Sequence, residues 1–105
     1  MYTFHVVWGA NLDSPDVAMV REFFRVYGIT PVEIELGSEE ETALRANAAK
    51  RYDCRATTWE CPFVALNNGE GDVVWCDGRP TYNGLLYAYQ VMVGERELNQ
   101  RASQR

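Results

Sequence analysis

Asn11-Leu12-Asp13-Ser14-Pro15-Asp16-Val17 is the stretch that decides the fold, because it predicts a loop that becomes the first turn of a helix. Ser14 is a suitable N-cap, since its hydroxyl can accept a hydrogen bond from a free backbone N–H of that turn. Pro15 then falls at the first helical position, where its missing N–H costs nothing. Asp16 places a negative charge near the positive end of the helix dipole. The stretch therefore predicts a helix that begins at Pro15.

This helix is predicted to extend to about Tyr27, with Gly28 ending it. One apolar stripe runs along it, formed by Val17, Val20, Phe23, Phe24 and Tyr27. The residues before the loop, Thr3 to Trp8, are typical of a buried strand. Thr30 to Leu36 alternates apolar residues with glutamates, which predicts a strand with one wet face near a sheet edge. Strand, helix and strand in this order predict a right-handed βαβ unit with parallel strands.

The second half of the chain adds a helix, a hairpin and a last helix. Ser38-Glu39-Glu40-Glu41 is a capping box that opens a helix running towards Tyr52, and we interpret its glutamates as capping residues rather than metal ligands. Strands are predicted at Cys61 to Leu66 and at Asp72 to Cys76, and the turn residues between them indicate a β-hairpin. Thr81 is suited to cap the last helix.

The resulting element order is β-α-β-α-β-β-α. It predicts an α/β fold with a four-stranded mixed sheet, in which a parallel βαβ half joins an antiparallel hairpin, and with helices on both faces. The chain of 105 residues is expected to form a single domain over residues 1–98, followed by a polar tail over residues 99–105.

The composition bounds the classes of function. The formal net charge is −5, which argues against binding to nucleic acid or to an anionic membrane, because both usually need a basic patch. No apolar run is long enough to span a bilayer. The N-terminus lacks the pattern of a signal peptide and enters a strand directly, so we expect a cytoplasmic protein.

Cys54, Cys61 and Cys76 form neither a disulfide framework nor a zinc pattern, since their number is odd and their spacing matches no usual ligand pair. We therefore expect no metal site. Cys76 is expected to pack in the core, on the same side of its strand as Val74. His5 is expected to be a core or strand-end residue rather than a ligand. A disulfide between Cys54 and Cys61 stays open.

Three segments occur in a recognisable order. Ser14-Pro15-Asp16-Val17 lies between a strand and a helix, Glu60-Cys61-Pro62-Phe63-Val64 opens the hairpin, and Pro80-Thr81-Tyr82-Asn83-Gly84-Leu85 follows it. In order and spacing they resemble the Cys-Pro-Tyr-Cys, Thr-Val-Pro-x-Val and Gly-Gly-x-Asp-x-Leu segments of the glutaredoxin branch of the thioredoxin fold, and of phage glutaredoxins in particular. The resemblance implies that Pro62 is cis and faces the N-terminus of the first helix.

The chain departs from this family at the residues that carry its chemistry. Ser14 and Val17 replace the two active-site cysteines, and a helix N-terminus cannot bring a serine hydroxyl near ionisation. Pro80-Thr81 replaces the double glycine, which in the family helps to hold glutathione. The rim of the implied site carries more carboxylates than arginines, namely Asp13, Asp16, Glu60 and Asp77 against Arg55 and Arg79. We therefore expect weak or no glutathione binding and no other cofactor.

These departures predict a redox-inactive, glutaredoxin-like binding module. The groove around the cis-proline would receive a polypeptide of a protein partner. Its predicted residues are Trp59, Glu60, Cys61, Pro62, Arg79, Thr81 and Tyr82. Trp59 is the preferred aromatic anchor, because Trp8 and Trp75 suit the core equally well. The resemblance to phage proteins implies a viral or mobile-element accessory protein that acts on a host factor.

Other functions stay open. Cys61 is a candidate catalytic residue of a monothiol disulfide oxidoreductase or redox sensor, because the resemblance places it beside the helix N-terminus. Its acidic neighbours Glu60 and Asp16 would raise its pKa. Acid–base chemistry by the rim carboxylates is the weaker alternative, since no histidine accompanies them. We expect a monomer or a homodimer, the latter through exposed Tyr87 and Tyr89 of the last helix.

Overall fold

The computed structural model describes residues 1–50 and 60–95 of the chain, so the predicted polar tail lies outside it. The predicted order of elements is confirmed, and so is the thioredoxin-like α/β topology. The elements are β1 (Thr3–Val7), α1 (Pro15–Val26), β2 (Val32–Glu33), α2 (Glu39–Ala48), β3 (Phe63–Asn67), β4 (Val73–Gly78) and α3 (Tyr82–Met92). Within the described residues, no helix is long and apolar enough to cross a membrane.

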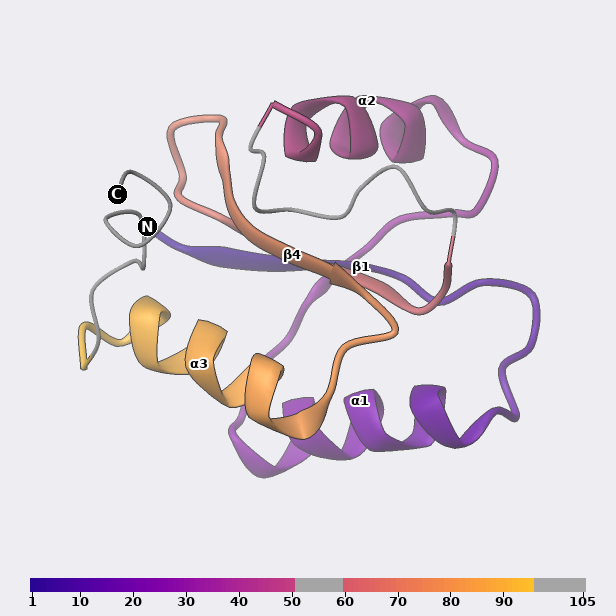
Figure 1. The fold of residues 1–105 in the computed structure, drawn as a ribbon, viewed down its shortest axis with the longest axis horizontal. Helices are drawn as coiled ribbons and strands as arrows, with labels where there is room; N and C mark the ends of the chain where they lie inside the picture. Colours follow the sequence, from indigo (N-terminus) through magenta and orange to yellow (C-terminus); the bar gives the residue numbers. More distant parts are fainter. Residues whose placement is uncertain (51–59, 96–105) are drawn as a thin grey trace, which may run out of the picture.

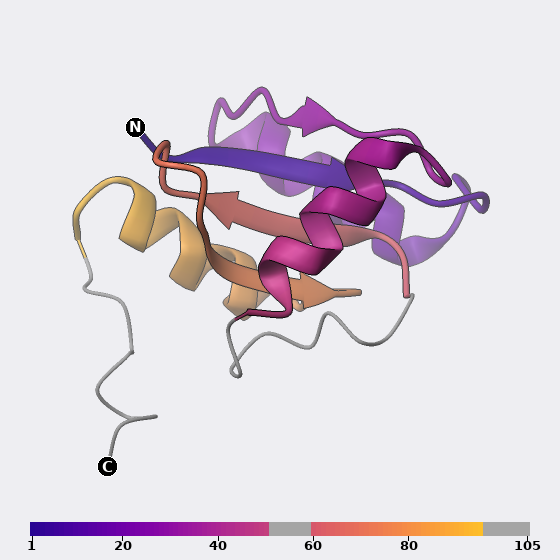
Figure 2. The same ribbon diagram turned by 90° about the horizontal axis from the view of Figure 1, so that it is seen from above.

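The sheet has four strands in the order β2-β1-β3-β4. β1 and β2 are parallel, and the β1–β3 and β3–β4 pairs are antiparallel, so the predicted mixed sheet is confirmed. α1 and α3 lie on one face of the sheet, and α2 covers the other face (Figure 1 and Figure 2). This arrangement brings the end of β1, the start of β3 and the N-terminus of α1 to the same end of the sheet.

Two apolar layers hold the helices to the sheet. One layer joins α1 and α3 to the sheet and includes Phe4, Phe23, Leu66 and Leu85. The other lies under α2 and includes Val7, Leu44, Phe63 and Cys76. Side chains of successive strand residues point to opposite faces, which is why Val6 and Val7 belong to different layers. Tyr87 and Tyr89, expected to be exposed, are half-buried against the first layer.

The first helix begins as the sequence predicts. Ser14 is the N-cap of α1, and its hydroxyl accepts a hydrogen bond from the N–H of Val17 at 3.1 Å. Pro15 is the first helical residue, and Asp16 lies in the first turn. At the other end Gly28 has a φ of 67°, the left-handed conformation in which a glycine ends a helix without steric cost.

The second strand differs from its prediction. A strand from Thr30 to Leu36 with one buried face was expected, whereas β2 has two residues and both are exposed. Val32 is 44% exposed and Leu36 is 47% exposed. The chain leaves the sheet after the N–H of Ile34 has bonded to β1, because Gly37, with a φ of 85°, turns it into α2. The predicted position at a sheet edge is confirmed.

β4 contains a bulge that the sequence did not predict. Trp75 and Val73 pair with consecutive residues of β3, so Val74 is an extra residue in the strand. Cys76 is buried as expected, but it lies in the layer under α2, whereas Val74 lies in the layer under α1 and α3. Their predicted placement on one side of the strand is therefore wrong, because the bulge reverses the alternation between them.

Candidate functional site

The bond between Cys61 and Pro62 is cis, as the resemblance implied. Pro62 is buried, and β3 begins at the next residue. The loop after β1 packs closely against this bond, since a Cβ atom added at Gly9 would lie 2.5 Å from the Cβ of Cys61. The close approach and the φ of 87° both require a glycine at this position. The β1–α1 loop and the cis-proline loop, defined as residues 60–62, form the centre of the candidate site.

The two positions that the resemblance compares with the cysteines of glutaredoxins have structural roles in this chain. The Ser14 hydroxyl caps α1 by accepting the N–H of Val17. The Val17 side chain is 1% exposed and belongs to the buried face of α1. The first turn of α1 therefore carries a capping hydroxyl and a buried isopropyl group at these two positions.

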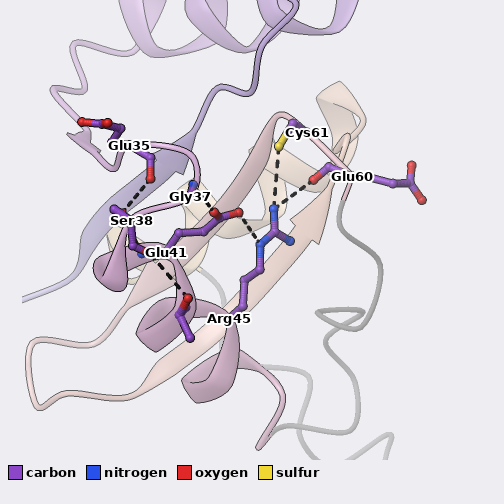
Figure 3. A network of polar contacts seen from close by, with 8 residues as sticks. Glu35, Gly37, Ser38, Glu41, Arg45, Glu60 and Cys61 are labelled. Atoms are coloured by element: carbon purple, nitrogen blue, oxygen red, sulfur yellow. Dashed lines mark hydrogen bonds and ion pairs between the residues drawn. The ribbon is translucent and has the colours of Figure 1, made fainter.

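Arg45 of α2, which was not predicted as a site residue, contacts the side chain of Cys61. Nη2 of Arg45 lies 3.7 Å from Sγ of Cys61 and donates to the carbonyl of Glu60 at 3.4 Å (Figure 3). The guanidinium carbon of Arg45 also lies 4.4 Å from the centre of the Phe63 ring. One buried arginine therefore contacts both the cis-proline loop and the first residue of β3.

Arg45 is held in place by an ion pair with Glu41, one helical turn earlier. Nε of Arg45 lies 2.8 Å from Oε2 of Glu41, and the two side chains are 3% and 4% exposed. The other carboxylate oxygen of Glu41 accepts a hydrogen bond from the N–H of Gly37 at 2.6 Å. Buried charges are rarely stable without a partner, so this ion pair fixes the guanidinium beside the cis-proline loop.

The predicted capping box of α2 supplies one member of this pair. Ser38 caps α2 as expected and accepts a hydrogen bond from the N–H of Glu41 at 3.1 Å. Glu41, however, reaches back to Gly37 instead of Ser38, and its second oxygen accepts from Arg45. The sequence contains one indication of this ion pair. Arg45 follows Glu41 by four residues, which places both on the helix face that also carries the buried Leu44.

The pKa of the Cys61 thiol is raised above its ordinary value. Burial is the largest cause, the guanidinium of Arg45 opposes it, and the negative charge of Glu41 adds to it. The predicted direction of the shift is therefore confirmed, but its cause is different, since the Glu60 side chain points away from Cys61 (Figure 3). Because only the thiolate is nucleophilic, this shift disfavours the reactive form of Cys61 near neutral pH.

Arg79 connects the other residues of the predicted rim. Its guanidinium lies 3.1 Å from the carboxylate of Asp16, in the first turn of α1, and 3.6 Å from that of Glu60. Its backbone N–H donates to the carbonyl of Pro62 at 2.7 Å. Its φ of 57° is uncommon for a residue other than glycine. The rim is therefore less acidic than its composition indicated, because two of its carboxylates are paired with this arginine.

The remaining predicted groove residues are placed in other ways. Thr81 is the N-cap of α3, and its hydroxyl accepts a hydrogen bond from the helix backbone at 3.0 Å. Tyr82 packs on α1, with its ring 5.4 Å from that of Phe23 and its hydroxyl 3.4 Å from that of Tyr27. Trp59 lies outside the described residues. The structure thus brings together Glu60, Cys61, Pro62 and Arg79, with Asp16 beside them.

The candidate site was also searched for metal-binding groups and for other titratable residues. In the part of the chain that the structure describes, no group of three or more His, Cys, Asp or Glu residues is arranged to hold a metal ion. His5 is half-buried in β1, and burial lowers its pKa, so its imidazole is neutral near pH 7. Cys54 lies outside the described residues, whereas Cys61 is a free cysteine in the structure, so the disulfide between them that the sequence left open is not formed there.

The chain was compared with models of protein families, with curated proteins and with solved structures, and none of the three comparisons gave a match. The thioredoxin-like topology therefore rests on the strand order and strand pairing of the molecule itself.

Proposed function

We propose that this chain is a degenerate glutaredoxin-like binding module, which holds an extended segment of a protein partner along the cis-proline loop. The observation that carries this proposal is the main chain of Cys61. Among the described residues, the N–H and C=O of Cys61 form no hydrogen bond, although Cys61 directly precedes the buried Pro62 and strand β3. Main-chain groups that have no partner in the described part of the chain, at the start of a strand, can pair with an added extended peptide.

Contacts with three other parts of the chain also support the cis-proline loop. Three contacts fix it, namely the hydrogen bond from Arg45 to the Glu60 carbonyl, the packing of Gly9 on Cys61, and the hydrogen bond from the Arg79 N–H to the loop. A preformed binding edge loses little conformational entropy when a ligand binds. The contacts around the loop therefore support a role in recognition.

Redox chemistry at the N-terminus of α1 is not part of this proposal, because Ser14 and Val17 occupy the dithiol positions. A partner with a basic or neutral polar surface would complement the net charge of −5. The resemblance to phage glutaredoxins supports a viral or mobile-element accessory protein that acts on a host factor.

Main-chain pairing can be tested by removing single N–H groups from a bound peptide. Short peptides are selected from a random library, each peptide bond is N-methylated in turn, and affinities are measured by titration calorimetry. We expect methylation at one position to weaken binding at least about tenfold and methylation at the next to have little effect, because successive N–H groups of an extended chain point to opposite sides. The amide resonance of Cys61 should shift on binding.

The variant Cys61→Ser is the matched control, since it changes the side chain and leaves the main chain in place. It should bind the selected peptides as the wild type does. Equal tolerance of N-methylation at every position would contradict main-chain pairing, and so would resonance shifts that lie only at the β3–β4 turn.

A second function is favoured by the position of Arg45. Its guanidinium lies 3.7 Å from Sγ of Cys61 and stabilises negative charge there, as a monothiol disulfide oxidoreductase or redox sensor would require. In that reaction the Cys61 thiolate would attack one sulfur of a mixed disulfide, form a new S–S bond and release the other sulfur as a thiolate. An external thiol such as glutathione would then attack the new disulfide and regenerate Cys61.

We expect glutathione-coupled reduction of a small mixed disulfide at pH 7 to stay at background in both the wild type and Cys61→Ser, because the raised pKa keeps Cys61 protonated. The variant Cys76→Ser, which removes a buried thiol, controls for the other cysteines. Activity in the wild type that disappears only in Cys61→Ser would establish the oxidoreductase function and contradict a redox-inactive module.

A further inference from the structure

A groove lies beside the candidate site, between the β1–α1 loop and the segment that joins β2 to α2. Its volume is about 320 Å³. The lining residues that matter are Trp8, Leu12, Glu33, Ile34, Glu35 and Leu36. Since this volume is at the lower end of the range for small-molecule sites, the groove suits one large side chain better than a cofactor.

The apolar part of the groove is exposed and preformed. Leu12 and Leu36 are 53% and 47% exposed, although leucine is among the residues most often buried. Trp8 is half-buried, and its Nε1 donates a hydrogen bond to Oε1 of Glu33 at 2.8 Å, which fixes the indole. Such a surface is typical of a pocket that receives an apolar anchor residue.

The rim of the groove is acidic. Glu33 and Glu35 are both exposed there, and within the described chain no lysine or arginine lines the groove. The guanidinium of Arg21 lies over the Trp8 ring, 4.7 Å from its centre, and offsets only part of this charge. A segment that presents basic residues on the same side as its apolar residue would therefore complement the groove better than one that presents acidic residues there.

The groove is continuous with the cis-proline loop through Gly9. This residue lines the groove, and it packs directly against Cys61. An extended peptide paired with the main chain of Cys61 would therefore pass the groove. Because alternate side chains of such a peptide face the same side, one of them can enter the groove while its neighbours stay outside.

We propose that this groove is the side-chain pocket of the cis-proline loop, and that the partner segment carries one large apolar residue with a lysine or arginine two residues before it and another two residues after it, on the same side of the extended chain. The apolar residue fills the space lined by Leu12 and Leu36, and the basic residues pair with Glu33 and Glu35. The inference rests on the proposed binding function and adds specificity to it, since main-chain pairing alone selects no particular sequence.

The probe for this pocket is the acetylated and amidated peptide Ser-Lys-Ser-Phe-Ser-Lys-Ser, in which phenylalanine and both lysines share one side of the extended chain. Its titration into the ¹⁵N-labelled protein is followed at the indole N–H resonance of Trp8, which reports on the groove through its bond to Glu33. We expect a saturable shift of this resonance and of the amides of Leu36 and Cys61. A peptide with alanine in place of phenylalanine should bind at least about tenfold more weakly, and one with glutamate in place of lysine should not bind.

Variants of the protein test the two parts of the pocket separately. Leu12→Ser combined with Leu36→Ser should weaken binding at least about tenfold and leave the fold intact, because both side chains are exposed. Glu33→Gln and Glu35→Gln should weaken binding most at low salt, where charges are screened least. Glu70→Gln changes the charge equally at the β3–β4 turn, outside the groove, and should have no effect.

The outcomes separate this inference from the proposed function. Binding that survives the two leucine substitutions, or that falls equally with Glu70→Gln, overturns the pocket and indicates attraction to the acidic surface in general. A shift at Cys61 without one at Trp8 overturns the pocket but leaves binding at the cis-proline loop intact. Shifts confined to Trp8 and Leu36 overturn the proposal that one segment binds the groove and the main chain of Cys61 at the same time. A lack of any saturable shift overturns the pocket, while the library selection still decides the proposed function.

Discussion

Replacing Arg45 with methionine is expected to lower the free energy of unfolding by about 3–5 kcal/mol at pH 7. The substitution leaves the carboxylate of Glu41 as an unpaired charge in a buried site. It also removes the hydrogen bond to the Glu60 carbonyl. The measurement is urea unfolding followed by circular dichroism, with the wild type alongside.

The chain contains a matched control for this substitution. Arg25 pairs with Glu22 in an ion pair whose side chains are mostly exposed. Arg25→Met should change stability little, because water and salt screen exposed pairs. Glu41→Leu added to Arg45→Met should recover part of the lost stability, since no buried charge then remains. If Arg45→Met were as mild as Arg25→Met, the ion pair would not be what holds α2 to the cis-proline loop.

The effect of Arg45→Met should also shrink in acid. Burial raises the pKa of Glu41, but the Gly37 N–H and the Arg45 guanidinium outweigh it and hold this pKa below its ordinary value of 4.5. A carboxyl group with a lowered pKa stabilises the fold fully above its unfolded pKa and loses this contribution as the pH falls through its folded pKa. Unfolding measured at pH 7 and again at about pH 3 should show the smaller difference at the lower pH.

The variant Ser14→Cys, made in a Cys61→Ser background, is expected to react with iodoacetamide at pH 7 at least about tenfold faster than Cys61 does in the native chain. A thiolate in place of the Ser14 hydroxyl would accept the hydrogen bond that the N–H of Val17 now donates to it, at the positive end of the α1 dipole. Cys61, by contrast, has a pKa that burial raises. Mass spectrometry of proteolytic peptides separates the individual thiols.

Ser38→Cys is the matched control for this variant, because Ser38 caps α2 with the same 3.1 Å geometry. Three glutamates occupy the first turn of α2, of which Glu41 is paired with Arg45, whereas the first turn of α1 contains the single carboxylate of Asp16, which is paired with Arg79. Nearby negative charge raises a thiol pKa, so a thiol at the α2 N-cap should react slowly. Equally slow reaction of both variants would mean that the start of α1 does not have the electrostatic character of a thiol site.

The features that the sequence predicts well are those with a local cause. Ser14, Ser38 and Thr81 each bond within the first turn of their own helix, so short-range chemistry determines where the helices begin. The cis bond at Pro62 has no such local signal, and its prediction came from the resemblance of the surrounding segments. Helix starts and element order could therefore be predicted from the residues alone, and the centre of the site only through the resemblance.

The features that escaped prediction depend on packing between elements. Three successive glutamates after Ser38 have a sufficient local explanation as capping residues. The packing of α2 on the sheet determines which of these glutamates is buried. It buries Glu41 together with Arg45 and leaves Glu39 and Glu40 exposed. The bulge at Val74 has the same kind of cause, because it exists only in the pairing of β4 with β3.

The buried ion pair has a consequence for how such a chain can diverge over generations. The cis-proline loop is supported by α2, through Glu41 and Arg45, whereas the positions suited to a reactive thiol belong to α1. Inherited changes at the start of α1 can therefore accumulate while the loop keeps its shape. For the binding module that we propose, this separation would let recognition by the loop persist while the first turn of α1 diverges.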